Sequence, residues 1–225
     1  MKCNILDLRP TQFAIGMLEI DEKIKEVSKM SKKELKAYVH DNVVPVVRSA
    51  DDELYIVDKH HFLSVCYHLD IKKVKVEIIK DFSLDLKMNY EKFWKWMLKT
   101  RNSYPYCQFG EGPREAIYLP HDIRGLADDP YRSIAWFVRK SGGFENTDKN
   151  FAEFQWANFF RSKHLLRKFG RKGFPQALVA AVKLAQSEDA RKLPGFDKLN
   201  EKDTIKAQVI AKAKGTKALN SKKPS

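Results

Sequence analysis

The sequence predicts an α+β fold in which a small domain with a mixed sheet precedes an all-helical domain. Three observations predict it. Short β-rich segments alternate with short amphipathic helices over residues 1–82. Apolar residues then recur at helical spacing, between helix-capping residues, over residues 83–198. Residues 199–225 are rich in lysine and lack aromatic residues, which predicts a basic, disordered tail.

The chain has 225 residues, 43% of them hydrophobic, which is enough to bury a substantial core. Its formal charge of +13 favours anionic partners such as nucleic acid, nucleotides or anionic lipid. The alternative is a basic protein whose charge is spread evenly. No apolar run reaches membrane-spanning length, and the N-terminus lacks the apolar stretch of a signal peptide.

The three cysteines, Cys3, Cys66 and Cys107, are far apart and form no CxxC pair. This spacing argues against a zinc ribbon. An odd number of cysteines without a disulfide framework indicates reduced thiols. We therefore expect a cytoplasmic protein.

The first domain begins with the segment CNILDL (residues 3–8), which alternates loosely and predicts a strand. Asp21 is placed to cap a short helix that runs to Met30. Ser31 is followed three residues later by Glu34, which is the capping-box pattern and predicts a second helix.

Two apolar β-rich segments follow, VVPVVR (43–48) and LYIV (54–57). Pro45 favours an edge strand or a strand start, because proline cannot donate to a ladder. A helix is expected over about 61–69. The segment VKVEII (74–79) then alternates charged and apolar residues, which predicts a strand with one wet face.

The second domain opens with a helix over residues 89–101, whose apolar residues gather on one broad side. Further along, Asp129 suits a helix N-cap and Pro130 the first helical position. Gly142 is placed to end that helix in a left-handed turn.

A longer helix is expected from Asn150 to Gly170, with Asn150 as its cap and Glu153 as its box residue. Pro175 opens another helix, whose sequence is PQALVAAVKLA.

The main candidate site is the corner between the strand at 54–57 and the helix after it, where Asp58, Lys59, His60 and His61 follow one another. A helix N-terminus presents unpaired amide groups and a partial positive charge, so anions bind there. Histidine and lysine side chains can add donors to a phosphate oxygen. The corner therefore predicts a phosphate-binding site.

Two other interpretations of the corner stay open. The histidines are also ordinary turn and cap residue types. His61 and His68 share a helix face, which would suit a metal site, but no third ligand is evident, and His68 also fits as a cation at the helix C-terminus. Asp58 would serve as a cap, a magnesium contact or a proton acceptor.

The ordered segments LDLRPTQFAIGMLEI, VVPVVR and LYIVDKHHFLSV resemble the ParB/sulfiredoxin superfamily. The later segments YPYCQFGEG, LADDPYRSIAWFVRKSGGF and FAEFQWANFFR are similar to a narrower bacterial family labelled ParB-like nuclease. The resemblance spans about residues 3–170. It implies a ParB/sulfiredoxin-like mixed-sheet domain over residues 1–82, which would bind a nucleotide.

In that superfamily a Gly-His-His-Arg or Gly-Glu-Arg-Arg box holds nucleotide phosphates at the start of a helix. The resemblance places Asp58, Lys59, His60 and His61 in this box, with ATP, ADP or CTP as ligand and Mg²⁺ as a candidate companion. Lys59 replaces the usual glycine. Phe62 replaces the usual arginine, which removes a bidentate phosphate clamp.

Members of the superfamily catalyse different reactions. Sulfiredoxin chemistry needs a cysteine where His60 stands, and Cys66 has the position of a core thiol. Resemblance to free-serine kinases implies nucleotide-dependent phosphoryl transfer or hydrolysis, with Glu19 as the base and Lys23 at the transferred phosphate. Alternatively, Glu19 and Lys23 are an ordinary helix pair four residues apart. A nuclease would need more acidic residues near the corner.

A ParB-type protein binds DNA, and this is the alternative function without catalysis. Basic residues gather in the segment RSKHLLRKFGRKGF, namely Arg161, Lys163, Arg167, Lys168, Arg171 and Lys172. Three residues of this segment, Arg161, His164 and Lys168, would share one helical stripe that meets phosphates. The alternative is a solvated face. No helix rich in short polar residues is evident, so sequence-specific reading is not expected.

A second polar concentration, RGLADDPYRS, contains Arg124, Asp128, Asp129 and Arg132. These side chains would line a pocket, or, more simply, Asp129 caps a helix and Arg132 pairs with it. The simpler interpretation is preferred.

Overall fold

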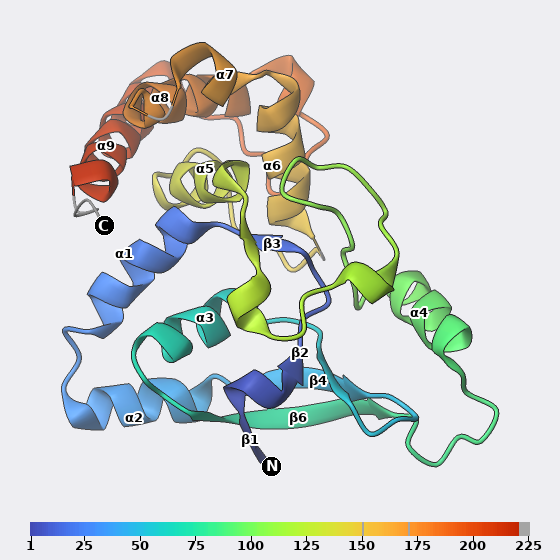
Figure 1. The fold of residues 1–225 in the computed structure, drawn as a ribbon. Coiled ribbons are helices and arrows are strands. Elements are labelled where there is room, and N and C mark those ends of the chain that lie inside the picture. The colour runs from blue at the N-terminus through green and yellow to red at the C-terminus, as the bar shows by residue number, and fades with distance from the viewer. Residues whose placement is uncertain (150, 171, 221–225) are drawn as a thin grey trace. The chain divides into compact units, whose positions relative to one another are not determined.

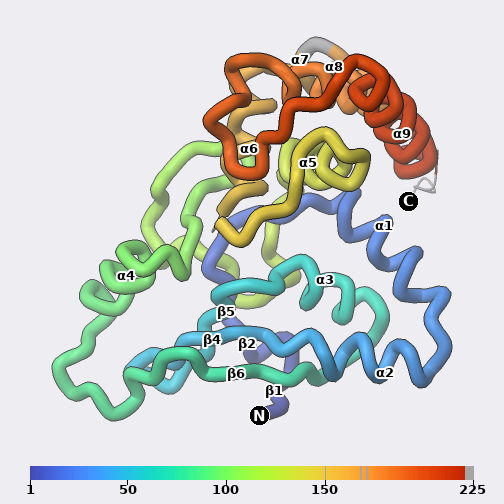
Figure 2. Tube along the Cα trace, turned by 180° about the vertical axis from the view of Figure 1, so that it is seen from behind, coloured from blue at the N-terminus to red at the C-terminus, as the bar shows by residue number. Residues whose placement is uncertain are grey.

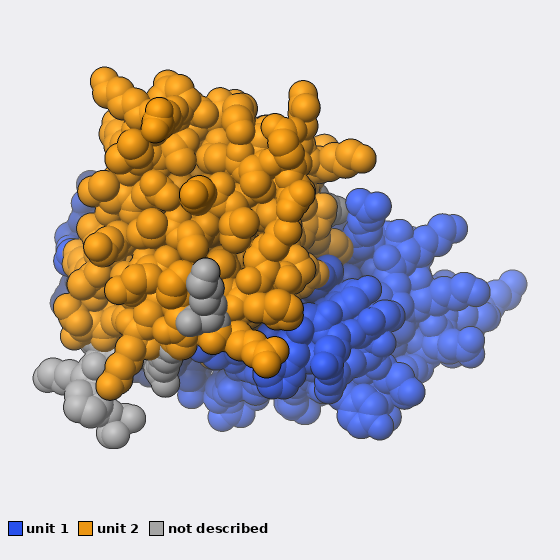
Figure 3. All heavy atoms as spheres, turned by 90° about the horizontal axis from the view of Figure 1, so that it is seen from above, with its two compact units in different colours: residues 1–15, 20–128 blue, residues 16–19, 129–225 orange. Residues whose placement is uncertain are grey.

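The computed structural model describes residues 1–149, 151–170 and 172–220. The chain forms two compact units (Figures 1, 2 and 3). The first comprises residues 1–15 and 20–128, and the second comprises residues 16–19 and 129–225. The first unit holds the strands and the second is helical, so the predicted α+β class is confirmed.

The first unit contains a five-stranded mixed sheet in the order β1-β6-β4-β5-β2, and a two-stranded ladder of β3 and β7. The strands are β1 (Lys2–Asn4), β2 (Leu8–Arg9), β3 (Ala14–Ile15), β4 (Val44–Arg48), β5 (Leu54–Ile56), β6 (Lys73–Asp81) and β7 (Ala127–Asp128). In the large sheet, β4 is parallel to β6 and antiparallel to β5. Strand β2 extends the sheet in parallel with β5.

Pro45 lies one residue after the start of β4, as a proline at a strand start should, although β4 is a central strand. The ladder between β4 and β6 shifts register between Val46 and Val47. Strand β6 buries Val74 and Val76 and exposes the charged residues between them, which confirms the predicted wet face.

The helices of this part of the chain are α1 (Met17–Val27), α2 (Lys32–Asp41), α3 (His60–His68) and α4 (Tyr90–Lys99), with 3₁₀ turns at Ile5–Asp7, Ala116–Tyr118 and Ile123–Gly125. Helix α1 begins four residues before Asp21, the expected cap. The predicted capping box of α2 is confirmed: Ser31 Oγ accepts from the Glu34 amide, and Glu34 accepts from the Ser31 amide over 2.7 Å.

Apolar side chains from several elements fill the interior of the first unit. The fully buried ones include Ile5, Leu8, Val44, Val46, Ile56, Leu63 and Val65. A separate aromatic cluster joins β4 to α4 through Val47, Phe82, Phe93, Trp94 and Met97. Figure 1 shows α3 lying over the sheet. Three residues, 57–59, separate the end of β5 from the first residue of α3, so the position of this strand constrains the start of the helix.

Two short contacts tie the beginning of the chain to residues far along it. Ala14 and Ile15 of β3 pair in parallel with Ala127 and Asp128 of β7. Gln12 forms an isolated parallel bridge with Tyr104. The first unit therefore needs residues well beyond position 82.

The second unit is built from α5 (Pro130–Lys140), α6 (Ala152–Ser162), α7 (Leu165–Phe169), α8 (Phe174–Ala185) and α9 (Glu201–Asn220), with a 3₁₀ turn at Glu188–Ala190. Its core contains Trp156 stacked on Phe144, with ring centroids 4.1 Å apart. Asp129 caps α5 and Pro130 is its first residue, as predicted.

The single helix expected from Asn150 to Gly170 is two helices. Helix α6 ends at Ser162, and His164, with φ 52° and ψ 33°, turns the chain into α7. Asn150, the expected cap, lies outside the described residues, and the N-cap residue of α6 is Phe151.

The disordered tail expected over residues 199–225 is corrected up to residue 220. Residues 201–220 form α9, which buries Ala207, Ala211, Gly215 and Ala218. Small residues at helical spacing allow this packing although aromatic residues are absent. The last residues, 221–225, lie outside the described part. Whether residues 1–82 and 83–198 fold as separate domains stays a prediction.

None of the helices in the described part of the chain combines the length and the apolar character that a membrane span requires.

Candidate functional site

The predicted corner is formed by β5 and α3, with Lys59 as the N-cap residue of the helix. Lys59 has φ 74° and ψ 20°, in the left-handed region, and its side chain does not cap the helix. A non-glycine residue adopts this conformation at a cost of about 1 kcal/mol. Lys59 stands where the superfamily box has glycine, and this backbone conformation explains the preference for glycine.

His60 is a buried structural link rather than an open ligand. Its side chain is 3% exposed, and its Nε2 accepts a hydrogen bond from the Thr11 amide over 3.2 Å. Thr11 Oγ1 in turn donates to the Ile56 carbonyl over 2.6 Å. Nε2 is thus the acceptor in this hydrogen bond, and contact of His60 with a phosphate stays a prediction.

The other corner residues are more open. Asp58 is exposed and His61 is half-buried. The half-buried Lys59 donates from Nζ to Asn42 Oδ1 over 3.0 Å, so its charge lies beside the end of α2. Phe62, which replaces the usual arginine, is buried and contacts the Tyr38 ring edge to face at 5.5 Å. The place of the arginine clamp is thus part of the core.

The segment around Ser103 and Tyr104 lies against Thr11, although no local sequence pattern connects it to the corner. Ser103 Oγ and the Tyr104 amide both donate to the Thr11 carbonyl, over 2.8 and 3.0 Å. Thr11 therefore joins the two segments: its amide contacts His60 and its carbonyl contacts Ser103 and Tyr104. Tyr104 and Tyr106 are half-buried, with ring centroids 4.6 Å apart. Their segment, YPYCQFGEG, supports the family resemblance but carries no local pattern that predicts a site.

Two ion pairs border the same part of the first unit. Arg9 forms a bidentate contact with Glu53, and its Nη1 donates to the His121 carbonyl over 3.1 Å. The hydrogen bond from Arg9 lowers the pKa of Glu53. Arg124 pairs with Asp122 over 2.7 Å and lowers the pKa of that carboxyl. These pairs fix the segment around His121.

Cys66 lies on α3 beyond the corner and is fully buried. Burial raises the pKa of its thiol to about 12. A thiol that stays protonated is unreactive, which confirms Cys66 as a core thiol.

Glu19 and Lys23 lie one turn apart on α1. Glu19 is 2% exposed and belongs to the second unit, whereas Lys23 is half-buried and belongs to the first. The burial of Glu19 differs from the solvated helix pair that was the alternative. Its role as a base at the corner stays a prediction.

Asp129 is 5% exposed and holds the start of α5 by accepting from the Tyr131 amide over 3.0 Å. Burial raises the pKa of this carboxyl, although the nearby Arg161 guanidinium acts in the opposite direction. Arg161 makes a short hydrogen bond to Asp129. Arg132 lies over the Phe154 ring at 3.5 Å, and its electrostatic effect on Asp129 is smaller than that of Arg161. The predicted cap is confirmed.

The six predicted nucleic-acid contacts differ in availability. Arg161 is bound to Asp129 and Asn158, and Lys163 pairs with Asp189 over 2.6 Å. Arg167 and Lys172 are exposed. The side chain of Lys168 and the whole of Arg171 lie outside the described part. The break at His164 removes the continuous stripe of Arg161, His164 and Lys168.

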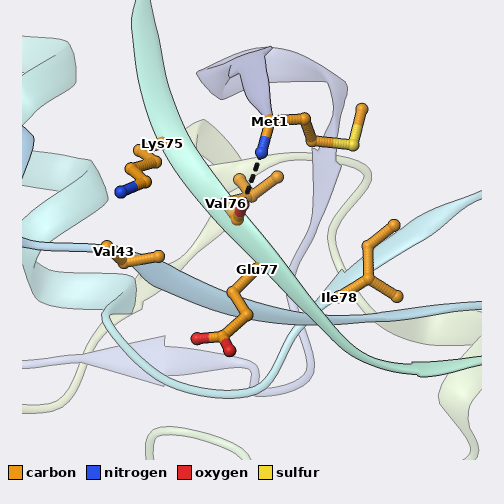
Figure 4. Close-up of a pocket in the computed structure, with 6 residues that line it drawn as sticks. All are labelled: Met1, Val43, Lys75, Val76, Glu77 and Ile78. Carbon is orange, nitrogen blue, oxygen red and sulfur yellow. Dashed lines mark hydrogen bonds between the residues drawn. The ribbon is translucent and has the colours of Figure 1, made fainter.

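Within the described ranges, no group of three or more histidine, cysteine, aspartate or glutamate side chains is arranged to hold a metal ion. A hollow of about 530 Å³ lies beside β6. Figure 4 shows the residues that line it: Met1, Val43, Lys75, Val76, Glu77 and Ile78. The N-terminal amine donates to the Val76 carbonyl there over 3.0 Å. None of the predicted site residues lines this hollow.

Comparisons with known proteins agree with the resemblance in the sequence. Residues 1–162 match the family described as putative ParB-like nuclease. The crystal structure of protein Atu1540 from Agrobacterium tumefaciens is similar, with 32% sequence identity and a TM-score of 0.77. The match covers 89% of this chain and 97% of that one. None of the curated proteins compared with the chain matches it.

Proposed function

Because the chain belongs to the family of putative ParB-like nucleases, we propose that it binds a nucleotide or a related phosphate compound at residues 58–61. The observation that carries the proposal is the backbone at Lys59. A left-handed residue followed directly by a helix turns successive amide groups toward one concavity, which suits an anion. The partial charge at the start of α3 acts in the same direction.

The described contacts suggest different roles for the four residues of the corner. His60 positions the loop around Thr11 through its hydrogen bond. Asp58 is exposed, and Lys59 and His61 are both half-buried; Lys59 already donates to Asn42, so we assign the donor to a phosphate oxygen to His61. Asp58 fits a Mg²⁺ ion that is held mainly by phosphate oxygens, because such ions use one or two carboxylates. ATP, ADP and CTP are the candidate ligands.

The binding proposal is tested by calorimetric titration of ATP, ADP, CTP and inorganic triphosphate. We expect His61→Ala to weaken binding about tenfold, the effect of one charge-assisted hydrogen bond. His68→Ala, at the other end of α3 and exposed, is the control and should bind as the wild type does. Equal affinities in wild type and His61→Ala would remove the corner from the proposal.

The catalytic part of the proposal is nucleotide-dependent phosphoryl transfer or hydrolysis, with Glu19 as general base and Lys23 at the transferred phosphate. The family resemblance suggests these roles, and Glu19 and Lys23 lie one turn apart on α1, on the same side of the helix. In a phosphate-transfer and phosphate-release screen, Glu19→Gln should lower the rate about 10²- to 10⁴-fold. Glu22→Gln on the same helix is the control. An unchanged rate in Glu19→Gln would exclude Glu19.

A second candidate function is nucleic-acid binding, and the division of charge between the units favours it. The second unit carries 21 lysine and arginine residues against 10 aspartate and glutamate residues, a net +11. The first unit has 21 against 19, a net +2. A charge concentrated in one unit is the electrostatic pattern of proteins that bind polyanions. Its test is DNA binding measured against salt; no binding at low salt would exclude it.

A further inference from the structure

Helix α9 is fixed to the second unit by one face only. It packs beside α8, as both Figures 1 and 2 show, through Ala207, Ala211, Gly215 and Ala218. A Cβ atom at Gly215 would lie 2.7 Å from Leu178 Cδ1 and 3.1 Å from Pro175 Cα. The two helices therefore approach closely, and the opposite face of α9 remains exposed.

Beyond its first turn, α9 exposes basic side chains and no acidic ones, together with the apolar side chains of Ile205 and Val209. Lys206, Lys212 and Lys217 are exposed, and no acidic residue occurs from Thr204 to Asn220. The acidic residues of the helix lie in its first turn, where the helix dipole favours them. The three lysines extend over about 16 Å of helix at 1.5 Å per residue.

The same face is hollowed. A depression of about 910 Å³ is lined by Val209, Lys212, Ala213, Thr216, Lys217 and Asn220. Val209 and Ala213 contribute apolar groups to this lining, and Lys212 and Lys217 contribute ammonium groups. This is an open surface that combines apolar side chains with two basic ones rather than an enclosed pocket.

We propose that this face of α9 binds the sugar–phosphate backbone of duplex DNA without reading its sequence; the proposal rests on the second candidate function. Charge complementarity selects a polyanion. Helix α9 has no aromatic residue on which single-stranded bases could stack. It also lacks arginine, the commonest base-reading side chain, so phosphate contact is the recognition that remains.

This assignment moves the DNA-binding surface away from residues 161–172. Arg161 and Lys163 of that segment already pair with Asp129 and Asp189. Releasing them would leave Asp129 buried without its guanidinium partner, which is costly. The lysines of α9 reach a phosphate without breaking such a pair.

The test is fluorescence anisotropy of a labelled random-sequence 30-bp duplex, titrated with the full chain between 50 and 200 mM salt. Each phosphate contact contributes a slope of about 0.9 in log affinity against log salt. The variant Lys206→Gln/Lys212→Gln/Lys217→Gln should therefore lose about 2.7 from the slope. Over this fourfold salt range, the affinity of the wild type should fall about 40-fold more than that of the variant.

Two matched variants keep the result interpretable. Lys32→Gln/Lys33→Gln/Lys36→Gln removes the same charge from exposed positions of α2 in the first unit, and should keep the wild-type slope. The variant Lys206→Arg/Lys212→Arg/Lys217→Arg should also keep the wild-type slope, because arginine preserves the positive charge at each position.

Three results would overturn the proposal. DNA binding with an unchanged slope in the α9 glutamine variant would place the surface elsewhere and leave the second candidate function standing. Absence of DNA binding at 50 mM salt would exclude both. Binding to vesicles with 30% phosphatidylglycerol, without binding to DNA, would identify a membrane surface as the partner.

Discussion

The imidazole of His60 accepts the backbone amide of Thr11 over 3.2 Å, and both residues are almost fully buried. The two residues are 49 positions apart, so this hydrogen bond joins the loop after β2 to the start of α3. It sets the position of the corner before any ligand binds.

Replacing His60 should therefore destabilise the fold. In His60→Ala the Thr11 amide loses its buried acceptor and a cavity forms, which together cost about 2–4 kcal/mol. Urea unfolding measures the change, with His61→Ala as the control at a half-buried position. A change below about 0.5 kcal/mol in His60→Ala would show that this hydrogen bond does not hold the corner.

The left-handed conformation of Lys59 leads to an opposite prediction. Lys59→Gly should stabilise the protein by about 0.5–1 kcal/mol, because glycine adopts positive φ without strain. The same substitution at Lys36, inside helix α2, should destabilise by about 1 kcal/mol. Thermal unfolding of both variants checks the contrast. A loss of stability in Lys59→Gly would mean that the Lys59–Asn42 hydrogen bond outweighs the strain.

Arg161 and Asp129 give a pH-dependent prediction. The pKa of Asp129 is raised in the folded state, so this carboxyl favours folding fully below its unfolded pKa and loses that contribution as pH rises through the folded pKa. Arg161→Leu should cost about 3–5 kcal/mol at pH 7, where the buried charge loses its partner. The cost should shrink toward pH 4 as Asp129 gains a proton.

Urea unfolding of Arg161→Leu and wild type at both pH values measures this dependence. The control is Arg167→Leu at an exposed position, where little change is expected. A cost for Arg161→Leu that is the same at pH 7 and pH 4 would contradict the assigned role of the Asp129 charge.

The close contact of Gly215 with α8 limits the size of the side chain that position 215 can hold. Gly215→Val should destabilise by about 1–3 kcal/mol, because its side chain would meet Leu178 and the backbone of Pro175. Ala213→Val on the exposed face of the same helix is the control and should change little. Chemical unfolding measures both. A Gly215→Val protein as stable as the wild type would contradict the size limit, because valine has a higher helix propensity than glycine and only packing can make it destabilising.

Tyr104 and Tyr106 allow the binding of a nucleotide's base to be tested separately from the binding of its phosphates. If the base of a nucleotide stacks on Tyr106, Tyr106→Leu should weaken nucleotide binding by about 1–3 kcal/mol and leave inorganic triphosphate binding unchanged. Tyr106→Phe keeps the ring and should behave as wild type. Equal loss for nucleotide and triphosphate would show that the variant disturbs the corner itself.

The elements that could be predicted from sequence are those with local signals. Ser31 with Glu34, and Asp129 with Pro130, mark helix starts within a few residues, and both are confirmed. The break at His164 could not be predicted, because a left-handed histidine leaves no pattern in its neighbours. Composition predicts a disordered tail where α9 forms, because the buried face of this helix consists of alanine and glycine, which are not recognised as core from composition.

The candidate site likewise has residues that the local sequence predicts and residues that it does not predict. Residues 58–61 are consecutive and stand between a strand and a helix, so the corner itself was predictable. Its partner Thr11 was not, because a hydrogen bond between residues 49 positions apart leaves no trace in local sequence. Ser103 is 92 positions from Thr11, and its contact likewise depends on the folded chain.

The parallel pairing of β3 with β7 has a practical consequence for fragment design. A polypeptide that stopped near residue 82 would leave Ala14 and Ile15 without their neighbouring strand, and Thr11 without Ser103 and Tyr104. An expression fragment meant to preserve the corner should therefore extend at least through Asp128.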